Sequence, residues 1–260
     1  MQKNLILMKF GGSLITDKES NTPKIRQDAL NQIAEILKNS KKKIIIVHGA
    51  GSYGHPIAKK YGIAEGLNHN KKQKTAINKT RKQVYKLNQL LCDRLKDAGI
   101  KTKTIIPSQT MRTRGPKNIE SFPEDDFNLA LKEQKIPVTY GDVTDDEVQG
   151  ISILSGDVIM MKLAKIYNPL FTIFVMDYPG VIKGYPERNS SEIIPLVDLD
   201  IRKSIKKHYK KDRKADVTGG LVGKLECAAK ISENSPCWIT NLDNLEGFLI
   251  DKPLGSKVIS

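Results

Sequence analysis

Six short apolar runs are spread along the chain. Three of them, LILMKF, KIIIVH and FTIFVMD, are almost continuously apolar, which is typical of strands buried on both faces of a sheet. The six runs cover residues 5–10, 43–48, 102–107, 136–142, 171–177 and 237–240. We therefore expect a sheet whose strands are covered by other elements on both sides.

Between these runs, apolar residues recur at helical spacing. The expected helices cover residues 25–38, 75–98, 126–134, 157–167 and 224–234. Gly99 directly follows the longest of them and suits its C-cap, because glycine readily adopts the left-handed backbone that closes many helices. Residues 145–153 predict a turn or a small hairpin.

The alternation of strands and helices predicts the architecture. Buried strands that alternate with helices favour a mainly parallel sheet with helices on both faces. We therefore expect an α/β fold, a three-layer αβα sandwich. Asn168 precedes Pro169, and a residue before proline disfavours the helical conformation. We place a lobe boundary there, which divides the chain into residues 1–168 and 169–260.

Length and cysteine content narrow the class of protein. The chain has 260 residues, of which 39% are hydrophobic, enough to bury a sizeable core. Cys92, Cys227 and Cys237 are odd in number and lack CxxC spacing, which disfavours a disulfide framework or a zinc ribbon. No apolar stretch matches a signal peptide or a membrane-spanning segment. We expect a cytoplasmic protein with no membrane partner.

The formal net charge of +14 favours anionic partners, such as phosphorylated metabolites or nucleic acid. The lysines are nevertheless spread over the whole chain, as on an ordinary solvated surface. The densest basic run, residues 201–214, holds eight Lys and Arg but a single aromatic residue, Tyr209. No nucleic-acid-binding motif accompanies it. We expect a solvated segment beside an anionic site, and no nucleic acid partner.

Four glycine-bearing segments follow strands or open helices. Glycine lets the backbone approach an anion and direct its N–H groups at it, and a helix N-terminus adds the attraction of its dipole. The segments are KFGGS (9–13), HGAGSYGHP (48–56), SGD (155–157) and DVTGGLVGK (216–224). One such loop is often an ordinary turn, but four in one α/β sheet predict a phosphate-binding site.

Two better-known phosphate-binding motifs do not account for these segments. GAGSYG (49–54) formally matches a dinucleotide-binding fingerprint, but residues 67–74 are basic and polar where an acidic residue after a strand is required. TGGLVGKL approaches a Walker A loop, but Thr218 stands where that motif has its first glycine.

Three lysines and two histidines stand out. Lys9 ends a buried strand beside a glycine turn, where an isolated ammonium group is costly unless it meets an anion. Phosphoryl transfer requires positive charge around the transferred group. Lys9, Lys18 and Lys224 are therefore candidates, with solvated surface charge as the alternative for the last two. His55 either donates to a phosphate, caps the next helix or is exposed, whereas we expect His48 to be packed in the core.

The motifs KFGGSLITDK, HGAGSYGHP, SGD and DVTGGLVGKLE occur in the order seen in the amino acid kinase superfamily, and the chain resembles it over essentially its whole length. The second motif, with its terminal histidine, is similar to that of the isopentenyl phosphate kinases and of fosfomycin-modifying kinases. The resemblance implies an amino acid kinase-like fold, with an acceptor-binding and dimer-forming N-terminal lobe and an ATP-binding C-terminal lobe. The implied activity is phosphorylation of isopentenyl phosphate in isoprenoid biosynthesis by the alternative mevalonate pathway. A small phosphonate or another phosphate is the alternative acceptor.

The resemblance also implies a role for each matching residue. The implied catalytic residues are Lys9, Lys18, His55 and Lys224. The implied acceptor-binding residues are Ala50, His55 and Gly156. The implied ATP-binding residues are Lys9, Gly11, Gly12, Ser13, Gly51, Asp177, Gly220 and Lys224. Ile77, Val84 and Leu87 either line a pocket for the isoprenoid tail or pack in the core.

The expected mechanism needs no general base, because a phosphate acceptor is already anionic. Magnesium is expected to arrive with ATP, and no metal ligand is predicted in the chain. The sequence departs from the superfamily at MDYPGV, where Tyr178 and Pro179 alter a loop that often reads TDVDGV.

Overall fold

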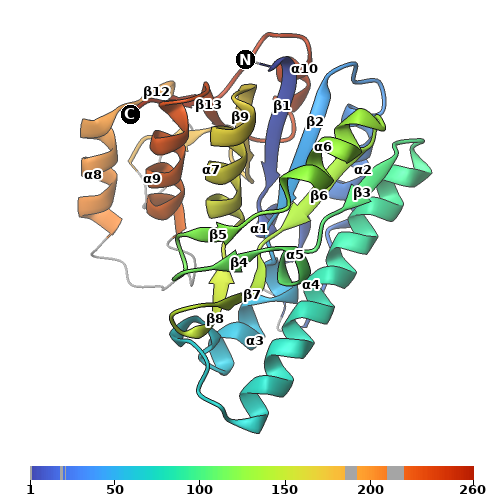
Figure 1. Cartoon of the computed structure of the whole chain (residues 1–260). Coiled ribbons are helices and arrows are strands. Elements are labelled where there is room, and N and C mark those ends of the chain that lie inside the picture. Colours follow the sequence, from blue (N-terminus) through green and yellow to red (C-terminus); the bar gives the residue numbers. More distant parts are fainter. Residues whose placement is uncertain (1, 18–19, 21, 185–191, 210–219) are drawn as a thin grey trace.

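The computed structural model describes the whole chain except residues 1, 18–19, 21, 185–191 and 210–219 (Figure 1). Its main sheet has eight strands in the order β12-β14-β13-β9-β1-β2-β6-β3. Neighbouring strands are parallel except β13 and β14. In that order the strands are Leu196–Val197, Ser256–Val258, Cys237–Thr240, Pro169–Val175, Gln2–Phe10, Lys43–His48, Ile136–Tyr140 and Thr102–Thr104. The predicted mainly parallel sheet is confirmed.

Helices cover both faces of this sheet, as the continuous apolar strands require. In β1, Leu5 and Leu7 pack into one apolar cluster, while Ile6 and Met8 pack into another on the opposite face. The first cluster includes α6 (Glu124–Lys132), α7 (Gly156–Tyr167), α8 (Leu199–Tyr209) and α9 (Gly220–Ser232). The second includes α2 (Gln27–Leu37), α4 (Lys71–Asp97) and α10 (Leu245–Leu249). The αβα sandwich is therefore confirmed.

Shorter elements gather at the carboxyl ends of the central strands (Figure 1). The helical ones are α1 (Gly12–Ile15), α3 (His55–Lys60), α5 (Pro107–Thr110) and the 3-10 turns η1 (Gly51–Tyr53) and η2 (Ile63–Glu65). A four-stranded sheet has the order β5-β4-β7-β8, with bounds Ile119–Ser121, Arg112–Thr113, Asp142–Asp146 and Gly150–Leu154. A further pair joins β10 (Val181–Ile182) to β11 (Ile193–Ile194).

The helix termini follow local capping chemistry. The long helix α4 begins at Lys71, four residues before the expected start, because the Asn70 side chain caps it by accepting the Lys72 N–H at 2.8 Å. Gly99 follows its last turn with φ of 82°, which agrees with the predicted glycine closure. The helix predicted over residues 224–234 begins earlier, at Gly220.

Three strand predictions are wrong at their ends, and the one over residues 171–177 is among them because β9 ends at Val175. The strand expected over residues 102–107 stops at Thr104, and Pro107 opens α5 because its fixed φ suits the first turn of a helix. The strand expected over residues 136–142 ends at Tyr140, and Asp142 begins β7 in the other sheet. The turn or hairpin expected over residues 145–153 is the β7–β8 hairpin.

The connection between α7 and β9 lies at the expected lobe boundary. Asn168 ends α7 in the left-handed conformation, with φ of 42°, and β9 begins at Pro169. Because β9 lies between β1 and β13, one sheet runs through both proposed lobes, and the division at residues 168 and 169 stays a prediction. None of the helices in the described ranges is long and apolar enough to cross a bilayer.

Candidate active site

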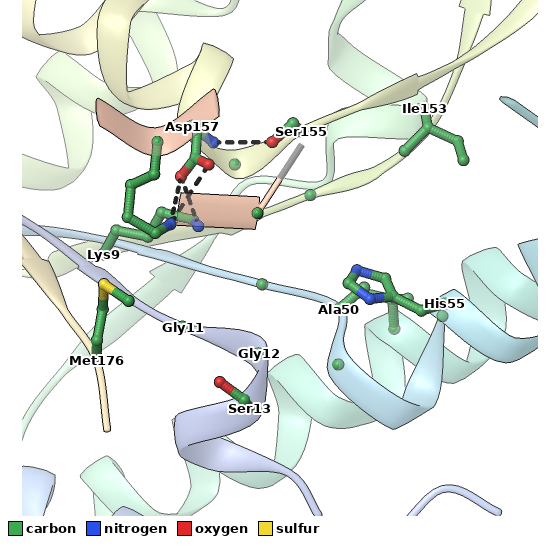
Figure 2. Close-up of a pocket in the computed structure, with 18 of the residues that line it drawn as sticks. Lys9, Gly11, Gly12, Ser13, Ala50, His55, Ile153, Ser155, Asp157 and Met176 are labelled. Carbon is green, nitrogen blue, oxygen red and sulfur yellow. Dashed lines mark hydrogen bonds and ion pairs between the residues drawn. The ribbon is translucent and has the colours of Figure 1, made fainter. Parts of the chain in front are cut away.

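A pocket of about 350 Å³ opens where the central strands β1, β2, β6 and β9 end. Figure 2 shows Lys9 and Asp157 at one side of it and Ala50 and His55 at the other. The lining includes every predicted site residue that the structure describes: Lys9, Gly11, Gly12, Ser13, Ala50, Gly51, His55, Gly156, Asp177, Gly220 and Lys224. Lys18 and residues 216–219 lie outside the described residues. The fold thus brings three glycine segments, and the described part of the fourth at residues 220–224, to one place.

The first two glycine loops touch backbone to backbone. A Cβ on Gly49 would lie 2.6 Å from the Gly12 nitrogen, and a Cβ on Gly12 would lie 2.5 Å from the Gly51 nitrogen. Gly51 also has φ of 50°, where a Cβ would lie 2.0 Å from Thr16 Oγ1. No side chain fits at these three positions without moving the backbone. The glycines therefore allow the loops that follow two neighbouring strands to lie in direct contact at the pocket.

The hydroxyl of Thr16 joins the same two loops. Its Oγ1 donates to the Gly12 carbonyl at 2.7 Å and accepts from the Ser52 N–H at 3.0 Å. Thr16 is fully buried, so water does not compete for these hydrogen bonds. Thr16 was not predicted as a site residue, since a lone threonine after a glycine turn carries no sequence signal.

A buried carboxylate joins the two catalytic lysine candidates. Lys9 Nζ lies 2.6 Å from Asp157 Oδ1 (Figure 2). Lys224 Nζ lies 3.3 Å from the same oxygen. The side chains of all three are at most 12% exposed. Both ammonium groups also lie over the Phe174 ring, at 6.0 Å and 5.1 Å from its centroid. The surface-charge alternative for Lys224 is therefore wrong.

Burial and neighbouring charge set the ionisation of this triad. Burial lowers the pKa of the Lys9 ammonium to about 8, with Asp157 opposing the change and Lys224 adding to it. Burial would raise the pKa of Asp157, but Lys224 and Lys9 outweigh it and lower the pKa to about 2. Near neutral pH the triad thus holds two ammonium groups and one carboxylate. Its single excess positive charge lies in a partly desolvated pocket, where it attracts a phosphate strongly.

The start of helix α7 carries the third glycine segment. Ser155 caps the helix by accepting the Asp157 N–H at 3.2 Å. A Cβ on Gly156 would lie 2.8 Å from Lys9 Cε, so the lysine stem runs directly over this glycine. The helix N-terminus consequently faces the pocket beside the lysine pair, where its dipole favours an anion.

The pocket also has an apolar part beside His55, which begins α3. Apolar and small side chains from four elements line it: Ala58 on α3, Thr80 and Val84 on α4, Val143 on β7 and Ile153 on β8. Of the three residues for which a tail pocket and core packing were alternatives, Val84 lines this pocket, whereas Ile77 and Leu87 pack in apolar clusters. One pocket thus joins a cationic end to an apolar end.

Arg26 ties the loop after β9 to the loop after β1. Its guanidinium group donates to the Asp177 carboxylate and, at 3.1 Å, to the Ser13 carbonyl. Asp177 is therefore held by an arginine at the pocket edge, beside Met176 and Tyr178. Arg26 escaped the sequence analysis because it precedes an ordinary amphipathic helix, and only the fold brings it to residue 177.

His48 is buried, as expected, and stacks on Tyr140 with ring centroids 5.1 Å apart. Of the basic run at 201–214, residues up to 209 belong to α8, and the rest lies outside the described residues. Lys206 in this helix pairs with Glu226 on α9 at 2.8 Å. Both side chains are about half exposed, so this pair lies on a solvated helix edge.

The chain belongs to the amino acid kinase family, whose sequence model matches residues 4–241. It is 33% identical to the isopentenyl phosphate kinase of Methanothermobacter thermautotrophicus over 232 residues, which are 85% of this chain and 84% of that protein. It is 30% identical to the isopentenyl phosphate kinase of Methanocaldococcus jannaschii over 237 residues, 87% of each chain. A crystal structure of isopentenyl phosphate kinase superposes with a TM-score of 0.83 at 27% identity, covering 98% of this chain and 99% of that one.

Proposed function

We propose that the protein is an ATP-dependent kinase that converts isopentenyl phosphate to isopentenyl diphosphate. The main observation behind this proposal is that one pocket joins a cationic phosphate cradle to an apolar end. An acceptor with a phosphate head and a short hydrocarbon tail matches both ends. The similarity to isopentenyl phosphate kinases supports the same acceptor. The apolar lining favours it over a small phosphonate such as fosfomycin, and we assign the enzyme to the alternative mevalonate pathway.

The chemistry is in-line phosphoryl transfer without a general base, because the attacking oxygen belongs to an anionic phosphate. The enzyme must bring two anions together and stabilise charge on the transferred group. In this proposal Lys9 and Lys224 contact the phosphoryl oxygens, assisted by N–H groups of the glycine loops. Asp157 keeps the two ammonium groups together before a phosphate arrives.

The two phosphates occupy different parts of the pocket in this proposal. Gly11, Gly12, Ser13, Gly51, Asp177 and Gly220 belong to the ATP side, and Ala50, His55 and Gly156 to the acceptor side. His55 donates to the acceptor's own phosphate, next to the apolar end. Lys18 belongs near the transferred group, by its place in the first motif.

Magnesium fits this pocket as an ion held by ATP. Three carboxylates line the pocket, and each is engaged: Asp157 with two lysines, Asp177 with Arg26, and Asp142 with the Ser108 and Val143 N–H groups. Among the described residues no group of three metal-ligating side chains gathers. Magnesium would therefore bind the ATP phosphates and reduce their charge. A homodimer and a cytoplasmic location complete the proposal.

The test compares acceptors directly. Purified protein is incubated with Mg-ATP and, separately, isopentenyl phosphate, dimethylallyl phosphate or fosfomycin, and ADP and the phosphorylated product are measured by phosphorus NMR. Isopentenyl diphosphate should form with the highest kcat/KM. Preferential turnover of fosfomycin would overturn the assignment, and so would salt-sensitive binding of duplex DNA without any ATP turnover.

A further inference from the structure

His48 ends strand β2 immediately before the second glycine loop, and the mechanism above gives it no part. Its side chain is fully buried and stacks on Tyr140 with an interplanar angle of 25°. Its Nδ1 atom lies 3.0 Å from the carbonyl oxygen of Gly49, the first residue of the loop. A core histidine thus contacts the backbone of the proposed phosphate cradle.

The surroundings select one protonation state of this ring. Burial lowers the pKa of His48 to about 4, so the imidazole is neutral near pH 7. A neutral imidazole carries one proton, and a carbonyl oxygen can only accept. The proton is therefore on Nδ1, which donates to Gly49. Nε2 is buried and has no partner within hydrogen-bond distance among the described residues, although the Asn88 side chain lies near enough to raise the pKa of the ring. The Gly49 carbonyl, 3.0 Å from Nδ1, is the acceptor within hydrogen-bond distance and therefore determines the tautomer.

Gly49 is held on its other sides as well. Its N–H donates to the Phe10 carbonyl at 3.0 Å, which ties it to the end of β1. Its Cα packs so closely on the first loop that a Cβ would lie 2.6 Å from the Gly12 nitrogen. With its N–H and its Cα fixed, the remaining freedom is rotation of the peptide that joins Gly49 to Ala50.

His48 removes that freedom. In a trans peptide the C=O and the following N–H point in opposite directions. Holding the Gly49 carbonyl toward the buried ring therefore directs the Ala50 N–H away from the core. Ala50 lines the pocket, and within the described chain no backbone acceptor takes its N–H.

We propose that His48 is a positioning residue: its Nδ1–H holds the Gly49 carbonyl so that the Ala50 N–H points at a phosphoryl oxygen in the pocket. This inference rests on the proposed function for the identity of the ligand. It further states that the hydrogen bond donated by Nδ1–H, and not the packing of the aromatic ring, determines the affinity for phosphate.

Two variants separate the donor from the ring. The side-chain amide nitrogen of asparagine lies about where Nδ1 of histidine lies, whereas that of glutamine lies about where Nε2 lies. His48→Asn thus keeps the donor to Gly49, and His48→Gln places its donor elsewhere. Both variants lose the stacking on Tyr140. A role in packing alone would therefore affect the two alike, and thermal unfolding establishes that both are folded.

The probe is inorganic pyrophosphate, whose binding is measured by calorimetry and which needs neither adenine nor isoprenoid contacts. His48→Asn should bind it within about threefold of the unmodified protein. His48→Gln should bind it about 10- to 100-fold more weakly, because a hydrogen bond to a charged group is misdirected. The kcat/KM for isopentenyl phosphate should follow the same order.

Equal pyrophosphate affinity in the two folded variants would overturn the inference. So would a nitrogen-15 NMR spectrum of the unmodified protein that places the His48 proton on Nε2. The proposed function fails separately, if the unmodified protein binds pyrophosphate and ATP but does not phosphorylate isopentenyl phosphate. In that case the comparison of the two variants still decides the role of His48.

Discussion

Replacing Asp157 by asparagine removes the charge between the two lysines while it keeps the size of the side chain. The carboxylate oxygen lies 2.6 Å from Lys9 Nζ and 3.3 Å from Lys224 Nζ. With an effective dielectric constant near 20, attractions at these distances amount to about 5–6 kcal/mol each. The loss of one changes the protonation equilibrium of a lysine by roughly ten-thousandfold. Since burial already lowers the pKa of Lys9 to about 8, Lys9 should be mostly neutral at pH 7 in Asp157→Asn.

The pH profile of kcat/KM for ATP measures this change, because it reports ionisation in the free enzyme. The unmodified enzyme should lose activity as the pH rises above about 8, where Lys9 loses its proton. In Asp157→Asn the same alkaline decline of kcat/KM should begin at a pH below about 7. At pH 7 the variant should lose about 3–5 kcal/mol of unfolding free energy. An alkaline limb that stays in place in a folded Asp157→Asn protein would refute the coupling of the two lysines through this carboxylate.

Further predictions concern the loops, the acceptor side and acid stability. Gly49→Ala should abolish activity and destabilise the fold by about 2 kcal/mol or more, because its Cβ meets the Gly12 backbone. Gly115→Ala, at a glycine of positive φ with open space around it, should cost about 1 kcal/mol in thermal unfolding and leave kcat unchanged. His55→Ala should lower kcat/KM for isopentenyl phosphate at least tenfold, while calorimetry finds ATP affinity unchanged; equal losses for both ligands would contradict its acceptor role. The low pKa of Asp157 stabilises the fold above about pH 4, and about 2 kcal/mol of unfolding free energy should be lost as the pH falls toward 2. Urea unfolding at a series of pH values measures this loss, which Asp157→Asn should not show.

The sequence was most informative where one residue type serves one physical requirement. Continuous apolar strands such as residues 43–48 predicted a sheet covered on both faces, and the β2 bounds match that run. The glycine loops could be predicted because close backbone contact, as between Gly12 and Gly49, leaves no room for a side chain and so requires glycine. Their proximity also followed, because parallel neighbouring strands end at the same edge of the sheet.

The missed residues are those whose importance depends on a partner far along the chain. Arg26 reaches residue 177 and Thr16 reaches residue 52 only after the strands have been ordered. Asp157 was noticed only as part of a glycine motif, since its pairing with Lys9 and Lys224 joins β1, α7 and α9. Two strand ends were mispredicted for a local reason: Pro107 opens a helix directly after the apolar residues Ile105 and Ile106, and Gly141 separates β6 from β7.

The contact between the first two glycine loops has a mechanical consequence. In the proposed mechanism the loop after β1 contacts ATP, and the loop after β2 contacts the acceptor through Ala50 and His55 and ATP through Gly51. These two strands are neighbours in parallel register, from Leu5 opposite Lys43 to Phe10 opposite His48. The separation of the two reacting phosphates is then inherited from the spacing of adjacent strands, about 4.8 Å, rather than from flexible side chains. A slip of this one strand pair would misalign the reaction even if every side chain in the pocket kept its place.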